Sequence, residues 1–341
     1  MRCFNLISFI QVSGCLKNPY RHCERMRSNL QKIRQNFLGS LSLKNGNAKM
    51  ISGSLKLKKR SIIVYNACFY HNLYTNDHAP ICRFWQSHCP QSFAEIHQLF
   101  AKQQGIDLIY EKRLVSGSLK DALQAFANDN GVGANVTVPC KEEAYRLCSQ
   151  LSDRAKAAGA VNTLIRLPEN TWHGDNTDGA GLVMDLQRLN ALSNGVKVLI
   201  IGAGGAARGV VLPLQQAGAE VFIHNRTQDK ALALANHFNA TALKYDELTT
   251  QAFDIIINAT SASLSGSTPN LPPQIFKNAQ LAYDMVYAKT ATPFMQFAHI
   301  SGCMKTADGL GMLVGQAAVS YHLWHNFMPN IETVLQQLRT Q

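Results

Sequence analysis

Residues 196–209 read VKVLIIGAGGAARG, and this stretch decides the fold. A continuous apolar run over 196–202 predicts a buried strand, and a helix follows the glycines. Gly202 permits a tight turn, Gly204 lets backbone amides approach a pyrophosphate, and the small Ala207 lets the helix pack closely on the strand. The G-x-G-x-x-A pattern between strand and helix therefore predicts a dinucleotide-binding turn, with the anion at the helix N-terminus.

The residues after this turn keep a regular alternation of strand and helix. The pattern predicts strands at 220–225, 253–260 and 281–287, with a helix at 229–238. Apolar strands that alternate with helices indicate a parallel sheet covered on both faces.

The preceding and following segments also have α/β patterns, and 341 residues are enough for two domains. Expected strands are 61–65, 107–115, 134–139 and 160–167, and expected helices are 93–104, 119–130, 141–148, 311–327 and 331–339.

The net charge of +11 comes from the start of the chain. Residues 1–60 hold 13 Lys and Arg and a single acid, Glu24, whereas the other 281 residues carry a net charge of −1. The nearly neutral remainder gives no sign of a nucleic-acid-binding surface. Residues 1–60 are expected to be a disordered or mis-annotated leader; a transit peptide and a lipoprotein signal are the alternatives.

Cysteine usage and hydropathy limit the compartment and the class of protein. Nine cysteines form no C-x-x-C pair, which argues against zinc and thioredoxin-like sites, and an odd count fits a reducing cytoplasm. No run of about 18 apolar residues predicts a membrane span. His322 and His325 share a helix face without a nearby carboxylate, so no metal site is expected, and Cys140 is interpreted as a packing residue.

The end of the second strand of the nucleotide unit indicates the cofactor. An NAD site usually places an acid there, but this chain has Asn225, Arg226 and Thr227, with Lys230 close behind. Arg226 could bind a 2′-phosphate through two charge-assisted hydrogen bonds, so NADP is predicted over NAD. The alternative is an ordinary solvated arginine.

Three polar residues outside the turn are candidates for proton chemistry. Lys141 opens a helix after 133–140, Asn162 lies at a strand, and Asp178 belongs to GDNTDGAG (174–181). A lysine at a helix N-terminus is electrostatically unfavourable. Together these groups could hold a polyhydroxylated substrate and move its proton. Taken alone, Lys141 could be a solvated helix residue and 174–181 a turn with an N-cap; Asp175 and Asn176 are kept as structural.

Seven motifs identify a resemblance to a known family. GANVTVPCKEEA, AGAVNT, GDNTDG, IGAGGAARG, NRT, YDMVY and ADGLGMLVGQAA occur in the order found in shikimate dehydrogenases, over about residues 107–341. The resemblance implies an N-terminal α/β substrate domain (61–177 plus 309–341) and a Rossmann-like, doubly wound NADP-binding domain (178–308), with the C-terminal helices returning to the substrate domain.

The resemblance also implies roles for single residues. Lys141 matches the catalytic lysine, and Asp178 matches its aspartate partner, which also binds the reacting hydroxyl. The matching substrate ligands are Thr137, Asn162, Tyr287 and Gln316. The matching NADP contacts are Asp153, Gly202, Ala203, Gly204, Gly205, Ala206, Asn225, Arg226, Thr227, Gln228, Asp229, Lys230, Met285 and Gly309.

The implied activity is the reversible NADPH-dependent reduction of 3-dehydroshikimate to shikimate in aromatic amino acid biosynthesis, in the cytoplasm. The alternatives are a quinate/shikimate dehydrogenase that uses NAD, and a non-catalytic NADP-binding regulator. The expected partner is the small-molecule substrate, with a homodimer left open and no nucleic acid or membrane partner expected.

The resemblance breaks down before residue 100. The family has a G-N-P-I string and a Ser-x-Ser-Pro pair for the substrate carboxylate, but residues 78–100 read HAPICRFWQSHCPQSFAEIHQLF. Ser87, Cys89 and Ser92 are the candidates for the missing pair, and a thiol is a poorer donor than a hydroxyl. This departure suggests a frame error or a degenerate start.

Overall fold

The structure is a computed structural model that describes residues 80–85 and 92–340. The leader 1–60, the expected strand 61–65, Ser87 and Cys89 lie outside the described residues. The described residues all belong to one compact unit of the chain.

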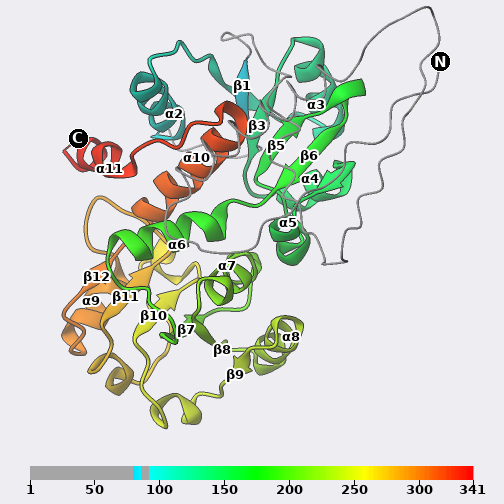
Figure 1. Ribbon diagram of the computed structural model, residues 1–341. Coiled ribbons are helices and arrows are strands. Elements are labelled where there is room, and N and C mark those ends of the chain that lie inside the picture. Colours follow the sequence, from blue (N-terminus) through cyan, green and yellow to red (C-terminus); the bar gives the residue numbers. More distant parts are fainter. Residues whose placement is uncertain (1–79, 86–91, 341) are drawn as a thin grey trace, which may run out of the picture. The chain divides into compact units, whose positions relative to one another are not determined.

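The first sheet is mixed and has the strand order β2-β1-β3-β5-β6-β4 (Figure 1). Its strands are β1 (Ile81–Trp85), β2 (Tyr110–Leu114), β3 (Gly133–Val136), β4 (Gln150–Leu151), β5 (Thr163–Arg166) and β6 (Trp172–Asp175). Its helices are α2 (Ser92–Gln104), α3 (Leu119–Asn128), α4 (Lys141–Leu147) and α5 (Asp153–Ala158). β5 runs antiparallel to both β3 and β6, which places the residues that precede β5 beside those that follow β6.

The second sheet is entirely parallel, as the sequence pattern predicts, with the order β12-β11-β10-β7-β8-β9. Its strands are β7 (Lys197–Ile201), β8 (Glu220–His224), β9 (Thr241–Ala242), β10 (Ile255–Asn258), β11 (Leu281–Asp284) and β12 (Thr306–Ala307). Its helices are α7 (Gly205–Gln216), α8 (Gln228–Phe238) and α9 (Pro293–Ile300). This order reverses between β7 and β10, which is where dinucleotides bind in doubly wound sheets.

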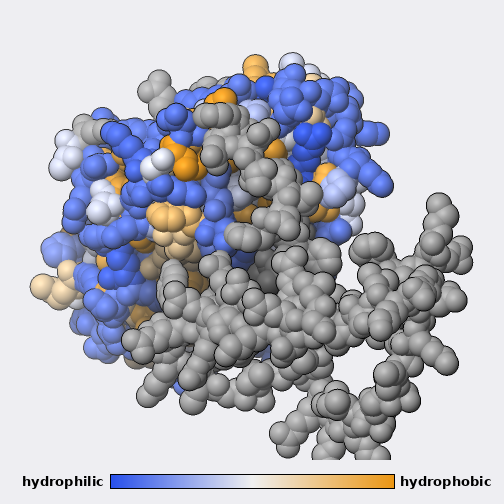
Figure 2. Space-filling view, turned by 45° about the horizontal axis from the view of Figure 1, so that its top comes forward, coloured by the Kyte–Doolittle hydropathy of each residue, from blue (hydrophilic) through white to orange (hydrophobic). Residues whose placement is uncertain are grey.

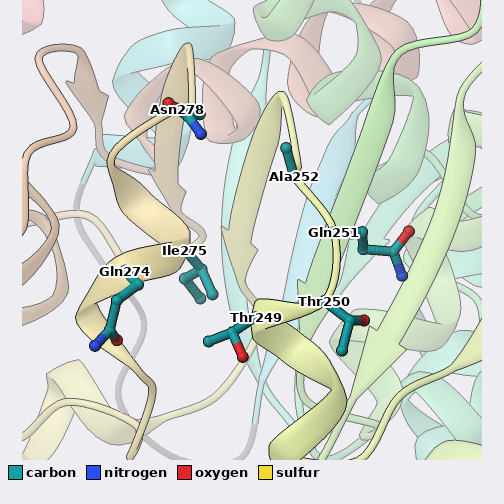
Figure 3. Close-up of a pocket in the computed structure, with 7 residues that line it drawn as sticks. All are labelled: Thr249, Thr250, Gln251, Ala252, Gln274, Ile275 and Asn278. Atoms are coloured by element: carbon teal, nitrogen blue, oxygen red, sulfur yellow. The ribbon is translucent and has the colours of Figure 1, made fainter.

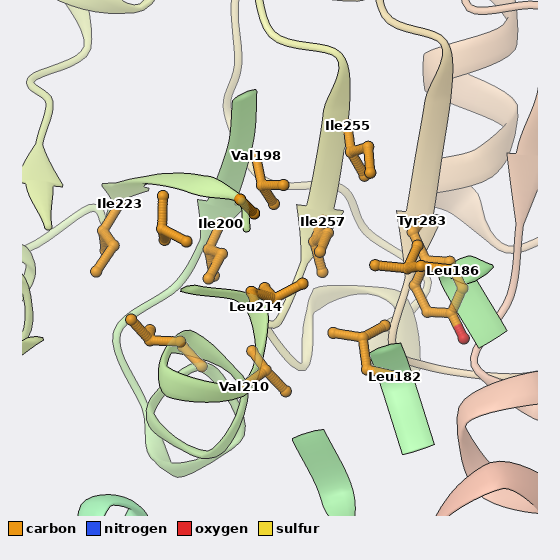
Figure 4. Packing of buried hydrophobic residues seen from close by; sticks show 14 of the residues in the cluster. Leu182, Leu186, Val198, Ile200, Val210, Leu214, Ile223, Ile255, Ile257 and Tyr283 are labelled. Carbon is orange, nitrogen blue, oxygen red and sulfur yellow. The ribbon is translucent and has the colours of Figure 1, made fainter. Parts of the chain in front are cut away.

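Both faces of the second sheet are buried, because its central strands are apolar at most positions. Val198 and Ile200 of β7 point to the face covered by α6 and α7, where they pack with Leu182 and Val210 (Figure 4). The alternate residues Leu199 and Ile201 point to the opposite face. The two-residue period of a strand therefore supplies two separate apolar cores.

Three further α-helices complete the described chain, namely α6 (Asp178–Arg188), α10 (Leu310–His325) and α11 (Ile331–Arg339). α6 and α10 cross with their backbones in contact. A Cβ at Gly181 would collide with the backbone nitrogen of Gln316, and one at Gly315 would lie 2.8 Å from the Gly181 oxygen. α10 also packs against α2, with Val314 and Ala317 in the same core as Phe93 and Ile96. The crossing fixes Gln316 near the start of α6.

Several elements differ from the sequence expectation. The expected strand 107–115 shortens to β2, and 134–139 ends at Val136 because a turn with a cis Val138–Pro139 bond follows. The sequence pattern also missed β1, β4, β6, β9, β12, α5 and α9. β6 (WHGD) has low intrinsic strand propensity, and its pairing with β5 and β4 stabilises it.

Candidate functional site

The backbone around Lys141 places its side chain at the edge of the first sheet. After β3, the Cys140 amide donates to the Thr137 carbonyl at 2.9 Å and closes a turn. Cys140 is the N-cap of α4 and its side chain is buried, with burial raising the pKa of its thiol. Cys140 is thus a packing residue, and Lys141 is the first residue of the helix.

Lys141 and Asp178 form an ion pair between two distant segments. Lys141 Nζ lies 2.6 Å from Asp178 Oδ2, and the side chains are 23% and 16% exposed. Asp178 is the first residue of α6, where the helix dipole favours a carboxylate. The Asp178 amide donates to Asn176 Oδ1 at 3.2 Å, a local contact that holds the segment before α6, whose N-cap is Thr177.

Asn162 connects this ion pair to α10. Its Oδ1 accepts from the Thr177 backbone amide at 2.9 Å, which assigns the amide orientation because a backbone N–H only donates. Its Nδ2 therefore faces Asp178 Oδ1 at 2.8 Å and Gln316 Oε1 at 2.9 Å. Lys141, Asp178, Asn162 and Gln316 thus form one continuous network, called here the Lys141 network.

The Lys141 network brings together an ammonium, a carboxylate and two amides that come from α4, α6, α10 and the residue before β5. An amine paired with a carboxylate can exchange a proton with a bound oxygen, and amides can donate to or accept from hydroxyl groups. The arrangement is suited to proton transfer on a small molecule that carries several oxygens.

The other expected substrate residues are less closely connected. Thr137 is half-buried in the loop before Lys141, and Tyr287 packs against the apolar core that contains α10. Within residues 80–85 and 92–340, neither side chain is hydrogen-bonded to the Lys141 network. Ser92 begins α2.

Asp175 anchors the segment that leads to Asp178. Its Oδ2 lies 2.5 Å from Arg154 Nη2, and its Oδ1 accepts from Ser152 Oγ at 2.5 Å. Burial by itself would raise the pKa of Asp175, but hydrogen bonds from Arg154, the guanidinium charge, Ser152 and the Asn176 amide hold it below its ordinary value. Sequence reasoning kept Asp175 as structural and missed Arg154, because no local pattern joins residues so far apart.

Asp153, expected near the cofactor, opens α5 with a highly exposed side chain. Its carboxylate lies 3.4 Å from Lys156 Nζ. This contact is an exposed helix pair and adds little to the stability of the fold.

The dinucleotide turn has the backbone that its glycines suggest. Gly202 has φ = +116°, and a Cβ there would lie 3.2 Å from Thr260. Gly204 and Gly205, in contrast, have open space around the Cβ position. No side chain caps the N-terminus of α7, whose first amides have no partner within the helix. Ala207 is fully buried against the sheet. The turn therefore offers uncapped donors to an anion.

The loop after β8 carries two exposed cations. β8 lies next to β7, the strand that leads into the glycine turn. Asn225 Nδ2 donates to the Thr227 carbonyl at 2.9 Å and shapes the start of α8. Arg226 and Lys230 are exposed, and neither forms an ion pair in the described part of the chain. Both side chains are free to bind a phosphate.

The ends of β10 and β11 hold a buried polar cluster that sequence reasoning missed. Asp284 is fully buried and accepts from Asn258, Ser263 and Thr292 side chains and from the Val286 amide. The Met285 amide donates to the Asn258 carbonyl at 3.0 Å.

Gly309 packs against the Met285 backbone. A Cβ at Gly309 would collide with the Met285 carbonyl. Met285 and Gly309 therefore lie together beyond the carboxyl ends of the parallel strands, the edge at which such sheets bind ligands.

A recess of about 320 Å³ lies at the opposite edge, at the amino ends of β10 and β11 (Figure 3). Its lining is formed by Thr249, Thr250, Gln251, Ala252, Gln274, Ile275 and Asn278. None of these residues is charged, and none belongs to the expected site. We therefore assign the site by the Lys141 network and the dinucleotide turn.

In residues 80–85 and 92–340, no group of three or more His, Cys, Asp and Glu gathers to hold a metal ion. Burial lowers the pKa of His322 on α10.

No described helix is long and apolar enough to cross a membrane. The coloured part of the face in Figure 2 is mostly hydrophilic with scattered apolar residues.

Three family models match successive parts of the chain. The shikimate dehydrogenase substrate binding domain matches residues 88–164. The shikimate/quinate 5-dehydrogenase model matches residues 186–271, and the shikimate 5′-dehydrogenase C-terminal domain matches residues 309–339.

The chain is also similar to solved structures, among them shikimate 5-dehydrogenases. An Ael1 enzyme from Pseudomonas putida is 37% identical, with a TM-score of 0.72, over 77% of this chain and 98% of that chain. Shikimate 5-dehydrogenase from Thermus thermophilus, in complex with NADP(H) and shikimate, is 29% identical over 76% and 99% of the two chains, with a TM-score of 0.68. Shikimate 5-dehydrogenase from Listeria monocytogenes, in complex with shikimate and NAD, is 25% identical over 76% and 96%, with a TM-score of 0.69.

Proposed function

Because the chain belongs to the shikimate dehydrogenase family, we propose that it catalyses the reversible NADPH-dependent reduction of 3-dehydroshikimate to shikimate. The observation that carries the proposal is the Lys141 network, in which four expected site residues from distant segments meet through hydrogen bonds of 2.6–2.9 Å. This activity belongs to the synthesis of aromatic amino acids.

In the proposed reaction, NADPH would supply, when bound, the hydride for the C3 carbonyl carbon and would leave as NADP. Lys141 donates the proton that the C3 oxygen needs, and it recovers a proton from solvent. Asp178 holds the Lys141 ammonium in place and accepts a hydrogen bond from the C3 hydroxyl of the product. Asn162, Gln316, Thr137 and Tyr287 are the proposed ligands of the remaining substrate oxygens.

We assign the cofactor to the uncapped turn and the cationic loop. Gly202 to Ala206 would hold the pyrophosphate, Asn225 to Lys230 would hold the 2′-phosphate, and Met285 and Gly309 would lie near the nicotinamide. The open space at Gly204 and the unpaired Arg226 support this assignment. Asp153 stays a weaker candidate, since its carboxylate pairs with Lys156.

The proposal includes two domains, one of residues 61–177 plus 309–341 and one of residues 178–308. Separate apolar cores around the two sheets support this division, and the packing of α10 against α2 supports the return of the C-terminal helices. We further propose a cytoplasmic enzyme, with a homodimer as its assembly.

Loss of NADPH absorbance in the presence of 3-dehydroshikimate tests the proposal with the full chain. We expect steady turnover with NADPH, much slower turnover with NADH, and NADPH formation when NADP and shikimate are supplied. Faster turnover of quinate with NAD would favour the quinate/shikimate alternative. NADPH binding without turnover of either substrate would instead favour the regulator.

A further inference from the structure

A layer of buried polar side chains lies directly behind the Lys141 network. Asn135, Thr163, Thr177 and Ser320 are each at most 3% exposed. They come from β3, β5, the N-cap of α6, and α10. Such a layer within an apolar core is costly unless every group is hydrogen-bonded.

Each member of this layer is close in sequence to an expected site residue. Thr163 follows Asn162, Thr177 precedes Asp178, Ser320 is one helical turn after Gln316, and Asn135 is two residues before Thr137. The layer therefore fixes the relative positions of four segments that each carry one site residue.

Ser320 is the centre of the layer. Its Oγ lies 2.7 Å from Thr163 Oγ1, 3.1 Å from Asn135 Nδ2 and 3.2 Å from Thr177 Oγ1. The Ser320 hydroxyl also lies 3.0 Å from the Gln316 carbonyl. Thr163 Oγ1 in turn lies 2.9 Å from Asn162 Oδ1.

The direction of these hydrogen bonds follows from which atoms can donate. Asn162 Oδ1 only accepts, so Thr163 donates to it, and the single Thr163 proton is then used. Ser320 then donates to Thr163 at 2.7 Å and shares its single proton with the Gln316 carbonyl at 3.0 Å, and Asn135 Nδ2 donates to Ser320. Tyr110 Oη donates to Asn135 Oδ1 at 2.9 Å, which orients the Asn135 amide.

The result is a buried donor chain that consists of Tyr110, Asn135, Ser320 and Thr163 and ends on Asn162. We propose that this buried donor chain positions Lys141 and Asp178 for proton transfer by holding the Asn162 amide, with Thr163 as a positioning residue that acts on the Asn162 oxygen beside the Thr177 backbone amide and hydroxyl. The inference rests on the proposed function for its kinetic effect. A flipped Asn162 would turn its oxygen toward the Asp178 carboxylate, and that contact is repulsive.

Thr163→Val tests the inference, because valine keeps the shape of threonine and removes only the hydroxyl. We expect kcat for 3-dehydroshikimate to fall about tenfold, roughly the effect of one lost hydrogen bond between buried groups. The dissociation constant for NADPH should stay within about twofold of the wild-type value, because the dinucleotide turn is untouched.

Two control variants separate positioning from simple destabilisation. Thr163→Ser keeps the hydroxyl and should restore most of the lost kcat. Val319→Ala removes buried apolar volume from the same helix as Ser320, and it should lower the melting temperature without lowering kcat. Wild-type kcat in Thr163→Val, or equal losses in Thr163→Val and Thr163→Ser, would overturn the inference.

The reactivity of Lys141 gives a second measurement that needs no substrate turnover. Amine acetylation of the full chain, followed by mass spectrometry, should label Lys141 severalfold faster in Thr163→Val than in the wild type, since the amine is less firmly paired. Equal labelling rates would overturn the inference. If the wild type fails to reduce 3-dehydroshikimate, the proposed function fails, while the labelling experiment still decides the inference.

Discussion

The Lys141 network and the dinucleotide turn are built in opposite ways. The network consists of side chains that already hydrogen-bond one another, and its Asn162–Gln316 contact joins residues 154 positions apart. The turn consists of backbone within a few consecutive residues, with open space at Gly204 and no side chain on the first amides of α7.

This difference indicates how each region meets its ligand. The network is preorganised, so a ligand there must fit groups whose positions the fold has fixed. The turn keeps its donors free, so the anion itself completes their hydrogen bonds. Substitutions in the network should therefore change turnover, whereas substitutions in the turn should change cofactor binding.

Lys141→Ala gives the largest expected effect and tests this separation most strongly. Loss of the proton donor should reduce kcat by about 10³-fold, while NADPH affinity changes less than about twofold. The measurement is NADPH absorbance with 3-dehydroshikimate, with Lys120→Ala on α3 as the exposed-lysine control. Equal losses of turnover and NADPH affinity would contradict the role assigned to Lys141.

Arg226→Ala should have the next largest effect, and it should act on binding. Loss of charge-assisted hydrogen bonds to the 2′-phosphate should weaken NADPH binding by about 30-fold and leave NADH binding unchanged. Titration of both cofactors checks this, with Lys277→Ala as the control, since Lys277 is an exposed cation in the segment before β11. A parallel loss for NADH would mean that Arg226 does not recognise the 2′-phosphate.

Gly202 and Gly204 form a matched pair within the turn. Gly204→Ala places a methyl in open space, so the melting temperature should hold while NADPH affinity falls about tenfold. Gly202→Ala forces alanine to φ = +116° and should destabilise the fold by about 1–3 kcal/mol as well. Unchanged NADPH binding in Gly204→Ala would show that the open space does not receive the cofactor.

Replacement of Asp175 should have the smallest effect. It should change the free energy of unfolding and its pH dependence, and not turnover or cofactor binding. Its pKa is lower in the fold than in the unfolded chain, so its contribution is present above about pH 4 and is lost as the pH falls through the lowered value. Between about pH 5 and pH 3, the wild type should lose up to about 1 kcal/mol more stability than Asp175→Asn in urea denaturation, because only the wild type takes up a proton at this position. Parallel pH profiles would contradict this assignment.

Motif patterns predicted the second sheet more accurately than the first. The strand 196–202 and the helix 229–238 have strong local patterns, and the structure places β7 and α8 there. β1 and β6 have mixed sequences, ICRFW and WHGD, and they become strands through pairing with neighbours on both sides. Pairing between distant segments leaves no local pattern to detect.

The residues of the candidate site also divide into those that the sequence indicated and those that it did not. Local sequence and family resemblance indicated Lys141, Asn162, Asp178 and Gln316 one by one, without their distances. Arg154 and Ser320 had no such signal, and Asp284 lies in the YDMVY motif but had no role assigned to it. Their polar atoms have partners only after the chain has folded.

By itself, the sequence determined the family, the parallel sheet of the nucleotide unit, the glycine turn and the cationic loop, because each of these depends on neighbouring residues. Only the tertiary structure decided that an ammonium, a carboxylate and two amides meet, and that a buried layer of hydroxyls lies behind them. The physical reason is that burial of polar groups from four segments is favourable only when all of them satisfy one another at once.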